Sequence, residues 1–368
     1  MNAGSDPKTY VVIVNWNGWK DTIECLESVF HLRNDNFVAI VCDNGSSDDS
    51  LRRIEEWSKG DQQVLPGSAE MEPYTHPPVA KPIPFIFLEA SQVGELRWAA
   101  RHERLILIRS EENLGFAGGN NLGLRHVLCR NDERYVWLLN NDTVVDPNAL
   151  GQLIKRMEED SRIGICGSKL CFYSAPGLIQ ACGGSSYSPL TGRNRHIGVG
   201  EPASAKGDRQ AVERRIGYVV GASLFVSKDF LLSIGLMNED YFLYYEELDW
   251  VARAEGKFLQ AYAPSSIVYH KQGSSLGGNW LARRSGPEDS YVASDFYSVR
   301  NQIRFTRRYY PQYLPMVAIT VAWRLLKRVA AGKRKRAWAV MRGVRSAFSK
   351  ENPRSLMTLE RRCGVGLP

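Results

Sequence analysis

Short apolar runs alternate with amphipathic segments along the first half of the chain. Residues 10–14 and 37–42 are unbroken apolar runs, typical of strands buried on both faces of a sheet. The segments that follow them, residues 21–30 and 51–57, place apolar side chains at helical spacing. Two strand–loop–helix units in succession predict an α/β protein with a mostly parallel, doubly wound sheet.

The same alternation resumes after an interruption. Six prolines lie between positions 66 and 84, so we interpret residues 60–103 as an insertion with one short strand at 85–88. Beyond it the pattern predicts helices at 124–129 and 147–157 and a polar, mobile loop at 188–211. Further strands are expected at 105–108, 135–139, 163–172, 178–187, 216–220 and 268–270.

One of these apolar runs ends abruptly in polar residues. Asn140, Asn141 and Asp142 follow the uncharged run 135–139 directly. Open α/β sheets bind ligands beyond the carboxyl ends of their strands, and a carboxylate flanked by amide oxygens suits a divalent cation. The alternative is a turn that closes the strand and caps the next helix. Asp142 is therefore a candidate metal ligand.

A second polar stretch follows an aromatic run. Glu246, Glu247 and Asp249 come directly after Tyr244 and Tyr245. Acids in the first turn of a helix favour the helix dipole, which is the structural interpretation. A carboxyl group near like charge and partly buried instead has a raised pKa and can act as a general base. Further along, His270 ends a predicted strand and is either structural or a metal ligand.

Glycines gather ahead of the predicted helix at 124–129. The segment 113–123 contains four of them, and glycines at a helix amino terminus can bring backbone N–H groups close to a phosphate. A dinucleotide-binding fingerprint would follow the first strand, with an acid about 20 residues further on. Here the glycines follow a later strand, which leaves an NAD-dependent oxidoreductase as a weak alternative.

Taken together, these stretches resemble the family 2 inverting glycosyltransferases with a GT-A fold, especially the rhamnosyltransferase-like branch that builds bacterial surface polysaccharides. The resemblance runs from about residue 10 to residue 305, with 60–103 unmatched. It is carried by residues 12–18, 43–46, 113–121, 139–143 and 245–250. Residues 139–143 are similar to the branch's metal-binding D-x-D motif, in which only the last acid is kept. Residues 245–250 are similar to the family's acidic segment, but Glu247 stands where the family usually carries an Asp base.

The resemblance implies a set of roles for individual residues. Asp142 and His270 would hold Mg²⁺ or Mn²⁺, and Glu247 would be the catalytic base, with Glu246 and Asp249 in the same acidic group. Because Glu is one methylene longer than Asp, Glu246 stays open as the base, and so does a catalytically inactive, sugar-nucleotide-binding relative. The residues implied in donor binding are Val14, Asn15, Asp43, Asn113, Gly118, Gly119, Asn120 and Asn141.

The same branch implies substrates. We expect a nucleotide-diphosphate sugar donor, most specifically deoxythymidine-diphosphate L-rhamnose. The expected acceptor is a saccharide or a lipid-linked saccharide, used in the synthesis of a cell-surface polysaccharide.

The composition indicates a cellular compartment and a division of the chain into two parts. The chain has 368 residues, and its seven cysteines form no CxxC pair, which is typical of reduced, buried thiols. The amino terminus lacks a charged-then-apolar signal, so a cytoplasmic protein is expected. We expect a glycosyltransferase domain over residues 1–310 and a basic, partly apolar segment over 311–368.

The net charge of +7 is concentrated near the carboxyl end. Residues 300–350 contain fourteen Lys or Arg and no Asp or Glu, whereas the rest of the chain carries 33 basic and 40 acidic residues. An apolar run of ten residues, 314–323, lies among these charges but is too short to cross a bilayer. Such a pattern suits peripheral binding to an anionic membrane surface at the inner face of the cytoplasmic membrane. Packing of the run on the domain is the alternative, and no nucleic-acid-reading motif accompanies the charges.

Overall fold

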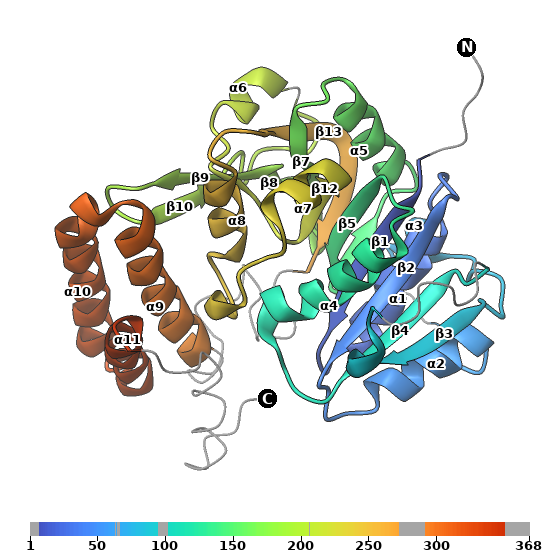
Figure 1. Ribbon diagram of the computed structural model, residues 1–368, viewed down its shortest axis with the longest axis horizontal. Coiled ribbons are helices and arrows are strands. Elements are labelled where there is room, and N and C mark those ends of the chain that lie inside the picture. The colour runs from blue at the N-terminus through green and yellow to red at the C-terminus, as the bar shows by residue number, and fades with distance from the viewer. Residues whose placement is uncertain are drawn as a thin grey trace.

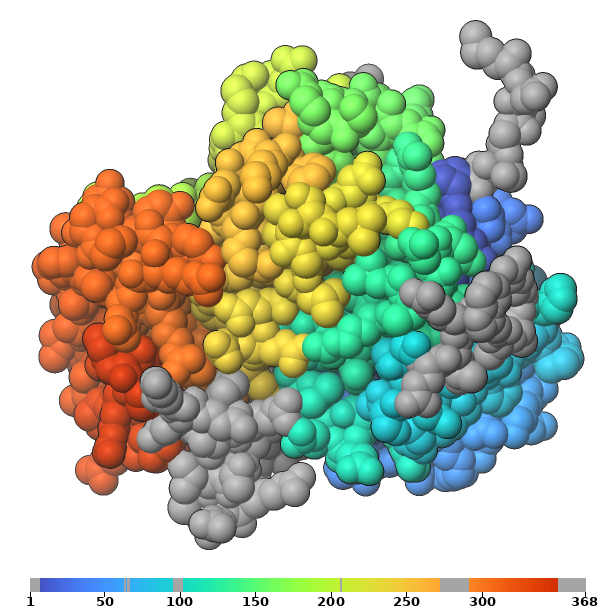
Figure 2. Space-filling view, in the orientation of Figure 1, coloured from blue at the N-terminus to red at the C-terminus, as the bar shows by residue number. Residues whose placement is uncertain are grey.

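The computed structural model describes residues 7–62, 64, 67–94, 102–205, 207–271 and 291–349. A large mixed sheet with helices on both faces forms the body, and three helices from the carboxyl-terminal part stand at one end of it (Figure 1). These three helices form one continuous lobe in the space-filling view (Figure 2).

The main sheet is mixed, with a parallel half. Its order is β3 (Phe85–Glu89), β4 (Leu105–Ser110), β2 (Phe37–Asn44), β1 (Thr9–Asn15), β5 (Tyr135–Asn140), β12 (Ser223–Ser227), β7 (Ile163–Phe172), β13 (Leu259–His270) and β6 (Thr143–Val145), with β8 (Ala175–Cys182) paired to β7. The first five strands run parallel, whereas β12 is antiparallel to both neighbours and β6 to β13. The predicted α/β class is confirmed, and the antiparallel strands are what the sequence did not indicate.

Helices cover both faces because alternate residues of the central strands point in opposite directions. Val11 and Ile13 pack in one apolar cluster with α1 (Trp19–Phe30), α2 (Ser50–Lys59) and α5 (Ala149–Glu158). Tyr10 and Val12 pack in another with α4 (Gly115–Arg130), α7 (Lys228–Ile234) and α8 (Glu246–Ala254). The apolar runs in the sequence are therefore strands buried on both sides.

The proline-rich insertion extends this sheet. It contains α3 (Glu72–Thr75) and β3, which pairs parallel to β4 where one short strand was predicted. The fully buried Glu27 of α1 fixes the insertion, because its carboxylate lies 2.8 Å from Lys81 Nζ and accepts a hydrogen bond from the Val79 N–H. Within the described residues, the insertion packs against the face that carries α1 and α2.

A second, smaller sheet stands where the sequence predicted the end of one strand (178–187), a polar loop (188–211) and a further strand (216–220). β9 (Gly184–Ser188) pairs antiparallel with β10 (Arg193–His196) and with β11 (Tyr218–Val219), and α6 (Arg209–Glu213) lies between β10 and β11 in the chain. The strand expected at 178–187 is divided at Gly183, whose φ of +69° turns the chain between β8 and β9.

The carboxyl-terminal lobe consists of α9 (Val292–Tyr309), α10 (Leu314–Ala330) and α11 (Arg334–Ala347). The three helices share one apolar cluster, in which Val299 and Ile303 meet Val317, Val321 and Val340. The apolar run 314–323 thus buries one side against α9 and α11. Among the described residues, no helix combines the length and apolarity that a membrane crossing requires.

Candidate active site

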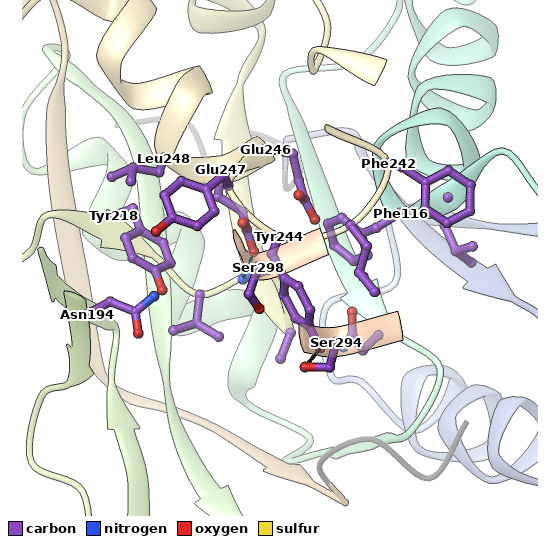
Figure 3. A pocket seen from close by; sticks show the side chains of 18 of the residues that line it. Phe116, Asn194, Tyr218, Phe242, Tyr244, Glu246, Glu247, Leu248, Ser294 and Ser298 are labelled. Atoms are coloured by element: carbon purple, nitrogen blue, oxygen red, sulfur yellow. Dashed lines mark hydrogen bonds between the residues drawn. The ribbon is translucent and has the colours of Figure 1, made fainter. Parts of the chain in front are cut away.

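A deep cleft lies at the carboxyl ends of β1 and β5. Its volume is about 1040 Å³, and its walls come from these strand ends, the start of α4, residues 218–222, residues 242–248, and the carboxyl-terminal lobe. Figure 3 shows from close by that side chains of α8, α9 and residues 242–244 line this cleft. Asn140, Asn141 and Asp142 line it, as their place after a buried strand predicts.

Asp142 and His270 meet at the floor of this cleft. Antiparallel pairing of β6 with β13 sets His270 opposite Thr143, directly after Asp142. The two side chains are almost fully buried, and His270 Nε2 lies 3.2 Å from Asp142 Oδ1 without forming a hydrogen bond. The opposite ring nitrogen, Nδ1, lies 2.7 Å from Gln180 Oε1. A carbonyl oxygen can only accept, so Nδ1 holds a proton, and in the neutral ring the lone pair of Nε2 faces the carboxylate.

This arrangement fits a divalent cation. A nitrogen lone pair and a carboxylate oxygen repel one another unless a proton or a cation lies between them. Neighbouring ligands of an octahedral ion at about 2.1 Å would lie about 3.0 Å apart, close to the separation of these two atoms. The described residues contain no group of three or more His, Cys, Asp and Glu suited to a metal. The pair would thus leave coordination positions for water and for substrate phosphate, as is usual for Mg²⁺.

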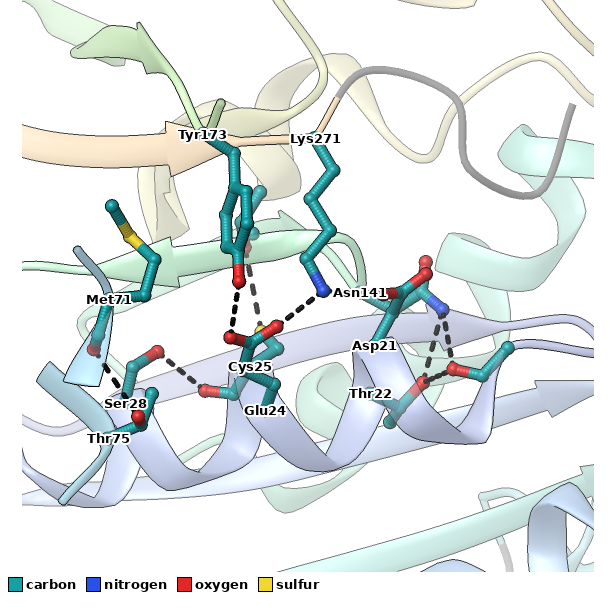
Figure 4. Close-up of polar contacts among 12 residues, drawn as sticks. Asp21, Thr22, Glu24, Cys25, Ser28, Met71, Thr75, Asn141, Tyr173 and Lys271 are labelled. Atoms are coloured by element: carbon teal, nitrogen blue, oxygen red, sulfur yellow. Dashed lines mark hydrogen bonds and ion pairs between the residues drawn. The ribbon is translucent and has the colours of Figure 1, made fainter. Parts of the chain in front are cut away.

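A polar network beneath the floor holds β13 against α1 (Figure 4). Lys271 Nζ lies 2.5 Å from Asp21 Oδ1 and also pairs with Glu24, which accepts a hydrogen bond from the Tyr173 hydroxyl. Burial alone would lower the pKa of Lys271, but Glu24 and Asp21 outweigh it and raise that pKa. The lysine therefore stays charged and locks the residue next to His270 in place.

The two glutamates at the start of α8 enter the cleft together. Glu246 is buried, and its Oε2 has no hydrogen-bond partner. Burial, followed by repulsion from Glu247, raises the pKa of Glu246 well above its ordinary value. Glu247 is half-buried and accepts a hydrogen bond from the Gly221 N–H at 3.1 Å; burial raises its pKa to about 6. Of the two, Glu247 therefore ionises at the lower pH, and Glu246 keeps its proton to a higher pH.

Gly221 is needed for this contact. A Cβ at position 221 would lie 2.5 Å from Glu247 Oε1 and 2.9 Å from Phe116 Cζ. Only glycine therefore lets the carboxylate approach the backbone N–H so closely.

The chain that leads into α8 is strained and is held from α9. Phe242, Tyr244 and Tyr245 all have positive φ, between 65° and 78°, which side-chain-bearing residues adopt rarely. The buried Asn301 donates from Nδ2 toward the carbonyl oxygens of Tyr241, Leu243 and Tyr244 at 2.8–2.9 Å. Arg300 supports the same turn through the Asp240 carbonyl. These contacts from α9 fix the direction in which Glu246 and Glu247 enter the cleft.

Asp249, the third acid predicted in the catalytic group, does not line the cleft. It is fully buried, accepts hydrogen bonds from the hydroxyls of Tyr241 and Tyr309, and pairs with Arg253. The structure therefore places Asp249 in a network that joins α8 to α9, apart from the two glutamates.

The predicted donor-binding residues divide into two groups. Those that line the cleft are Val14, Asn113, Asn120 and Asn141. Asn15 and Asp43 lie below its surface, where the Asn15 amide donates to Asp43 Oδ1 at 2.7 Å and its oxygen accepts from the Thr22 hydroxyl. Burial raises the pKa of Asp43, which the bonds from Ser46 and Asn15 oppose.

Gly118 and Gly119 belong to the helix α4 rather than to a loop before it. A Cβ at position 119 would lie 2.8 Å from Val14 Cγ1, and one at Gly123 would lie 2.5 Å from Val12 Cγ1. The glycine cluster therefore allows close packing of α4 on β1. Gly118 and Gly119 do not line the cleft, whereas Asn120 of the same helix does.

Several cleft residues were not predicted to be part of the site. Tyr218 comes from the small sheet, and Ser294 and Ser298 lie one turn apart on α9, with the Tyr244 hydroxyl 3.3 Å from Ser294 Oγ (Figure 3). Arg193, Arg324, Arg328, Lys333 and Arg336 also line the cleft. Only the fold brings these positions to the strand ends.

Comparison with known proteins agrees with this geometry. Residues 10–66 and 92–198 match the family described as Glycosyl transferase family 2. A curated relative, the low-salt glycan biosynthesis hexosyltransferase Agl10 of Haloferax volcanii, is 25% identical over 170 residues, which are 46% of this chain and 52% of the relative. The chain thus spans about half the length of that curated relative.

Comparison with solved structures gives two that are similar to this chain over much of its length. GalNAc-T7 with UDP, GalNAc and Mn²⁺ has a TM-score of 0.50 at 13% identity, covering 83% of this chain and 50% of that one. The mannosyltransferase PcManGT of Pyrobaculum calidifontis, in complex with GDP-Man and Mn²⁺, has a TM-score of 0.47 at 13% identity, covering 98% of this chain and 81% of that one. The likeness to GalNAc-T7, at 13% identity, supports the fold alone, and nothing is concluded from the likeness with a TM-score of 0.47. The sheet topology and the likeness to GalNAc-T7 show an α/β fold of the GT-A type, and the segments that match glycosyltransferase family 2 lie within it.

Proposed function

We propose that this protein transfers a sugar from a nucleotide-diphosphate donor to a hydroxyl group of a saccharide acceptor, with inversion at the anomeric carbon. The observation that carries the proposal is that one cleft contains both the Asp142–His270 pair and an ionised glutamate. The first is suited to a cation that binds a diphosphate, and the second to removing a proton. The matched family domain includes Asp142.

Asp142 and His270 are the residues that would hold Mg²⁺ or Mn²⁺ in this account. When bound there, the ion would neutralise negative charge on the departing diphosphate. Gln180 would keep the His270 ring in the required tautomer, and Lys271, held by α1, would keep the end of β13 in position.

Glu247 would accept the proton of the acceptor hydroxyl. As that O–H bond breaks, the acceptor oxygen forms a bond to the anomeric carbon, and the bond from that carbon to the diphosphate oxygen breaks. The nucleoside diphosphate leaves with the bonding electrons, and the proton stays on the Glu247 carboxyl group. The Gly221 N–H would orient the carboxylate, and the raised pKa of Glu246 would favour a neutral carboxyl group beside it.

For the donor we propose deoxythymidine-diphosphate L-rhamnose, and for the acceptor a lipid-linked saccharide of a cell-surface polysaccharide. This choice follows the sequence resemblance. A thermal-shift screen of dTDP-, UDP- and GDP-sugars with Mn²⁺ tests it, because a ligand that binds only the folded state raises its apparent stability. We expect the largest shift from the dTDP-sugar and none with Asp142→Asn. A larger shift from a UDP- or GDP-sugar would contradict the donor. Shifts without any product release would indicate a catalytically inactive relative.

We also propose that the carboxyl-terminal lobe binds an anionic membrane surface at the inner face of the cytoplasmic membrane. One side of α10 and α11 is exposed and apolar, with Ile319, Leu326 and Phe348 each about 60% exposed. Trp323 and Trp338 lie on the same helices, among basic residues that would each contribute ~1 kcal/mol near anionic lipid. Apolar and aromatic anchors between basic residues are typical of an interfacial helix.

Flotation with liposomes of graded anionic content tests the membrane proposal. Binding should rise with anionic lipid, fall with salt, and be lost when Ile319, Trp323 and Leu326 are all changed to Ser. Leu232→Ser is the matched control, since Leu232 is 64% exposed but lies on α7. If the unaltered chain stays with the soluble fraction at every lipid composition, the proposal is wrong.

A further inference from the structure

The end of the cleft formed by the carboxyl-terminal lobe is strongly basic. Five side chains define this basic end: Arg193, Arg324, Arg328, Lys333 and Arg336. The carboxylate that lines the cleft beside them is Asp295 on α9, which pairs with Arg328 at 3.1 Å and with Arg336 at 2.6 Å. One negative charge therefore meets five positive ones.

Three of these cations have no carboxylate of their own. Within the part of the chain that the structure describes, the side chains of Arg193, Arg324 and Lys333 make no hydrogen bond and no ion pair. Arg324 is only partly exposed. Burial lowers the pKa of its guanidinium, Asp295 acts in the opposite direction, and Arg328 and Arg193 lower it further. Guanidinium groups nevertheless stay protonated in proteins, so the charge persists.

A partly buried, uncompensated cluster of cations is unfavourable unless an anion joins it. The basic end is also preorganised. The turn that presents Arg193 is fixed at Thr191, whose carbonyl oxygen accepts from Gln302 of α9 and from Thr320 of α10. The Tyr245 hydroxyl donates to the neighbouring Gly192 carbonyl. Cations presented from a fixed backbone around an open space are typical of a site for a phosphate group.

The basic end does not belong to the floor of the cleft. Asp142 and His270 lie at the ends of β5 and β13, whereas the cations come from β10, α10, α11 and the turn between these helices. Glu246 and Glu247 enter the same cleft from α8. A donor diphosphate held at the floor would thus leave the basic end free for the second substrate.

We infer that the basic end of the cleft binds the phosphate or diphosphate of an anionic acceptor, in which the sugar that receives the transferred residue is linked to a lipid through phosphate. This inference rests on the proposed function and names the chemistry of its acceptor. The apolar side of α10 would lie at the membrane that holds the lipid, while Arg324 and Arg328 of the same helix contact the phosphate.

The test measures binding alone, so it does not require turnover. Farnesyl diphosphate and the uncharged alcohol farnesol are titrated into the full chain in the presence of EDTA, which removes any metal at Asp142. The variant is Arg324→Gln/Lys333→Gln. The matched control is Arg342→Gln/Arg345→Gln, because these α11 cations do not line the cleft. A second arm titrates dTDP and UDP with Mn²⁺ into the same proteins.

We expect farnesyl diphosphate to bind, farnesol to bind at least ~10-fold more weakly, and the cleft variant to lose ~10-fold or more of its affinity for the diphosphate. The control variant should bind the diphosphate like the unaltered chain, and nucleotide binding should be the same in all three proteins. Equal diphosphate binding by the cleft variant, or none by any protein, would overturn the inference. Selective loss of nucleotide binding in the cleft variant would assign the cations to the donor and also overturn it.

Discussion

Replacement of Glu247 by Gln is expected to change catalysis and stability in opposite directions. The change keeps the shape of the side chain and the acceptor atom for the Gly221 N–H, but it removes the ionisable group. General base catalysis typically contributes ~10²- to 10⁴-fold, so we expect kcat to fall by about that factor while donor affinity stays near that of the unaltered protein. In the unaltered protein, kcat/KM should rise with pH through about 6 as Glu247 ionises.

The same change should stabilise the folded state at high pH. Glu247 has a folded-state pKa of about 6 against an ordinary 4.5, a difference worth about 2 kcal/mol. A raised carboxyl pKa means that the folded state binds the proton more tightly than the unfolded state. Stability therefore declines between about pH 4.5 and pH 6 as the carboxylate forms. Glu247→Gln escapes this penalty, which is complete above pH 6 and absent below pH 4.5.

Denaturant unfolding at pH 4 and pH 8 measures the stability effect. We expect Glu247→Gln to be about 2 kcal/mol more stable than the unaltered chain at pH 8 and equal to it at pH 4. Turnover is measured on the same preparations. An equal gain at both pH values would refute the role of ionisation, and unchanged kcat would refute Glu247 as the base. If Glu246→Gln is the inactive variant instead, the base lies one residue earlier.

Three further changes test how the glutamates are positioned. Asn301→Ala removes the donor to three carbonyl oxygens of the strained turn. We expect denaturant unfolding to show ~1–3 kcal/mol less stability, and kcat to fall by a larger factor than donor affinity. Gly221→Ala places a methyl group against the Glu247 carboxylate, so it should lower kcat at least ~10-fold with little change in donor Kd. Gly177→Ala is the control, because a Cβ at position 177 has no atom within 4 Å, and it should change neither kcat nor donor Kd. Asp249→Ala leaves Arg253 without its carboxylate and should cost ~3–5 kcal/mol of stability, while the protein that remains folded should still be active. An inactive but fully stable variant would show that Asp249 takes part in the reaction.

The sequence predicted best those elements whose side chains face apolar surroundings on every side. β1, β2 and β5 are buried on both faces, so their sequences are continuous apolar runs that indicate strands without further information. The strand of the small sheet that the sequence missed is β10, which is short, polar and mostly exposed, so no period-two pattern marks it. The turn before β10 is held by hydrogen bonds from α9 and α10 to the Thr191 carbonyl oxygen, from residues distant in sequence.

The start of α4 was missed for a different reason. Glycine disfavours helices in isolation, which made residues 115–123 look like a loop. In the fold, Gly119 and Gly123 let the helix approach Val14 and Val12 of β1 to contact distance, and this packing outweighs the local preference. Tertiary contact between two segments about 100 residues apart cannot be inferred from either segment alone.

The sequence predicted several residues of the site but not how they lie relative to one another. Asp142 and His270 were both candidates for a metal, yet their approach to 3.2 Å depends on the antiparallel register of β6 and β13. The basic composition of residues 300–350 was evident, but a helix has two sides. The fold turns Arg324 and Arg328 toward the cleft and leaves Ile319 and Leu326 exposed.

The most direct test of the proposed transferase is release of nucleoside diphosphate from a panel of nucleotide sugars. The full chain is assayed with Mn²⁺ or Mg²⁺, with EDTA, and as the variants Asp142→Asn and Glu247→Gln. We predict release from at least one nucleotide sugar that requires the metal and is lost in Asp142→Asn, with donor binding retained in Glu247→Gln but release reduced ~10²-fold or more. Release that persists at full rate in EDTA and in Asp142→Asn, or no binding of any nucleotide sugar, would contradict the account.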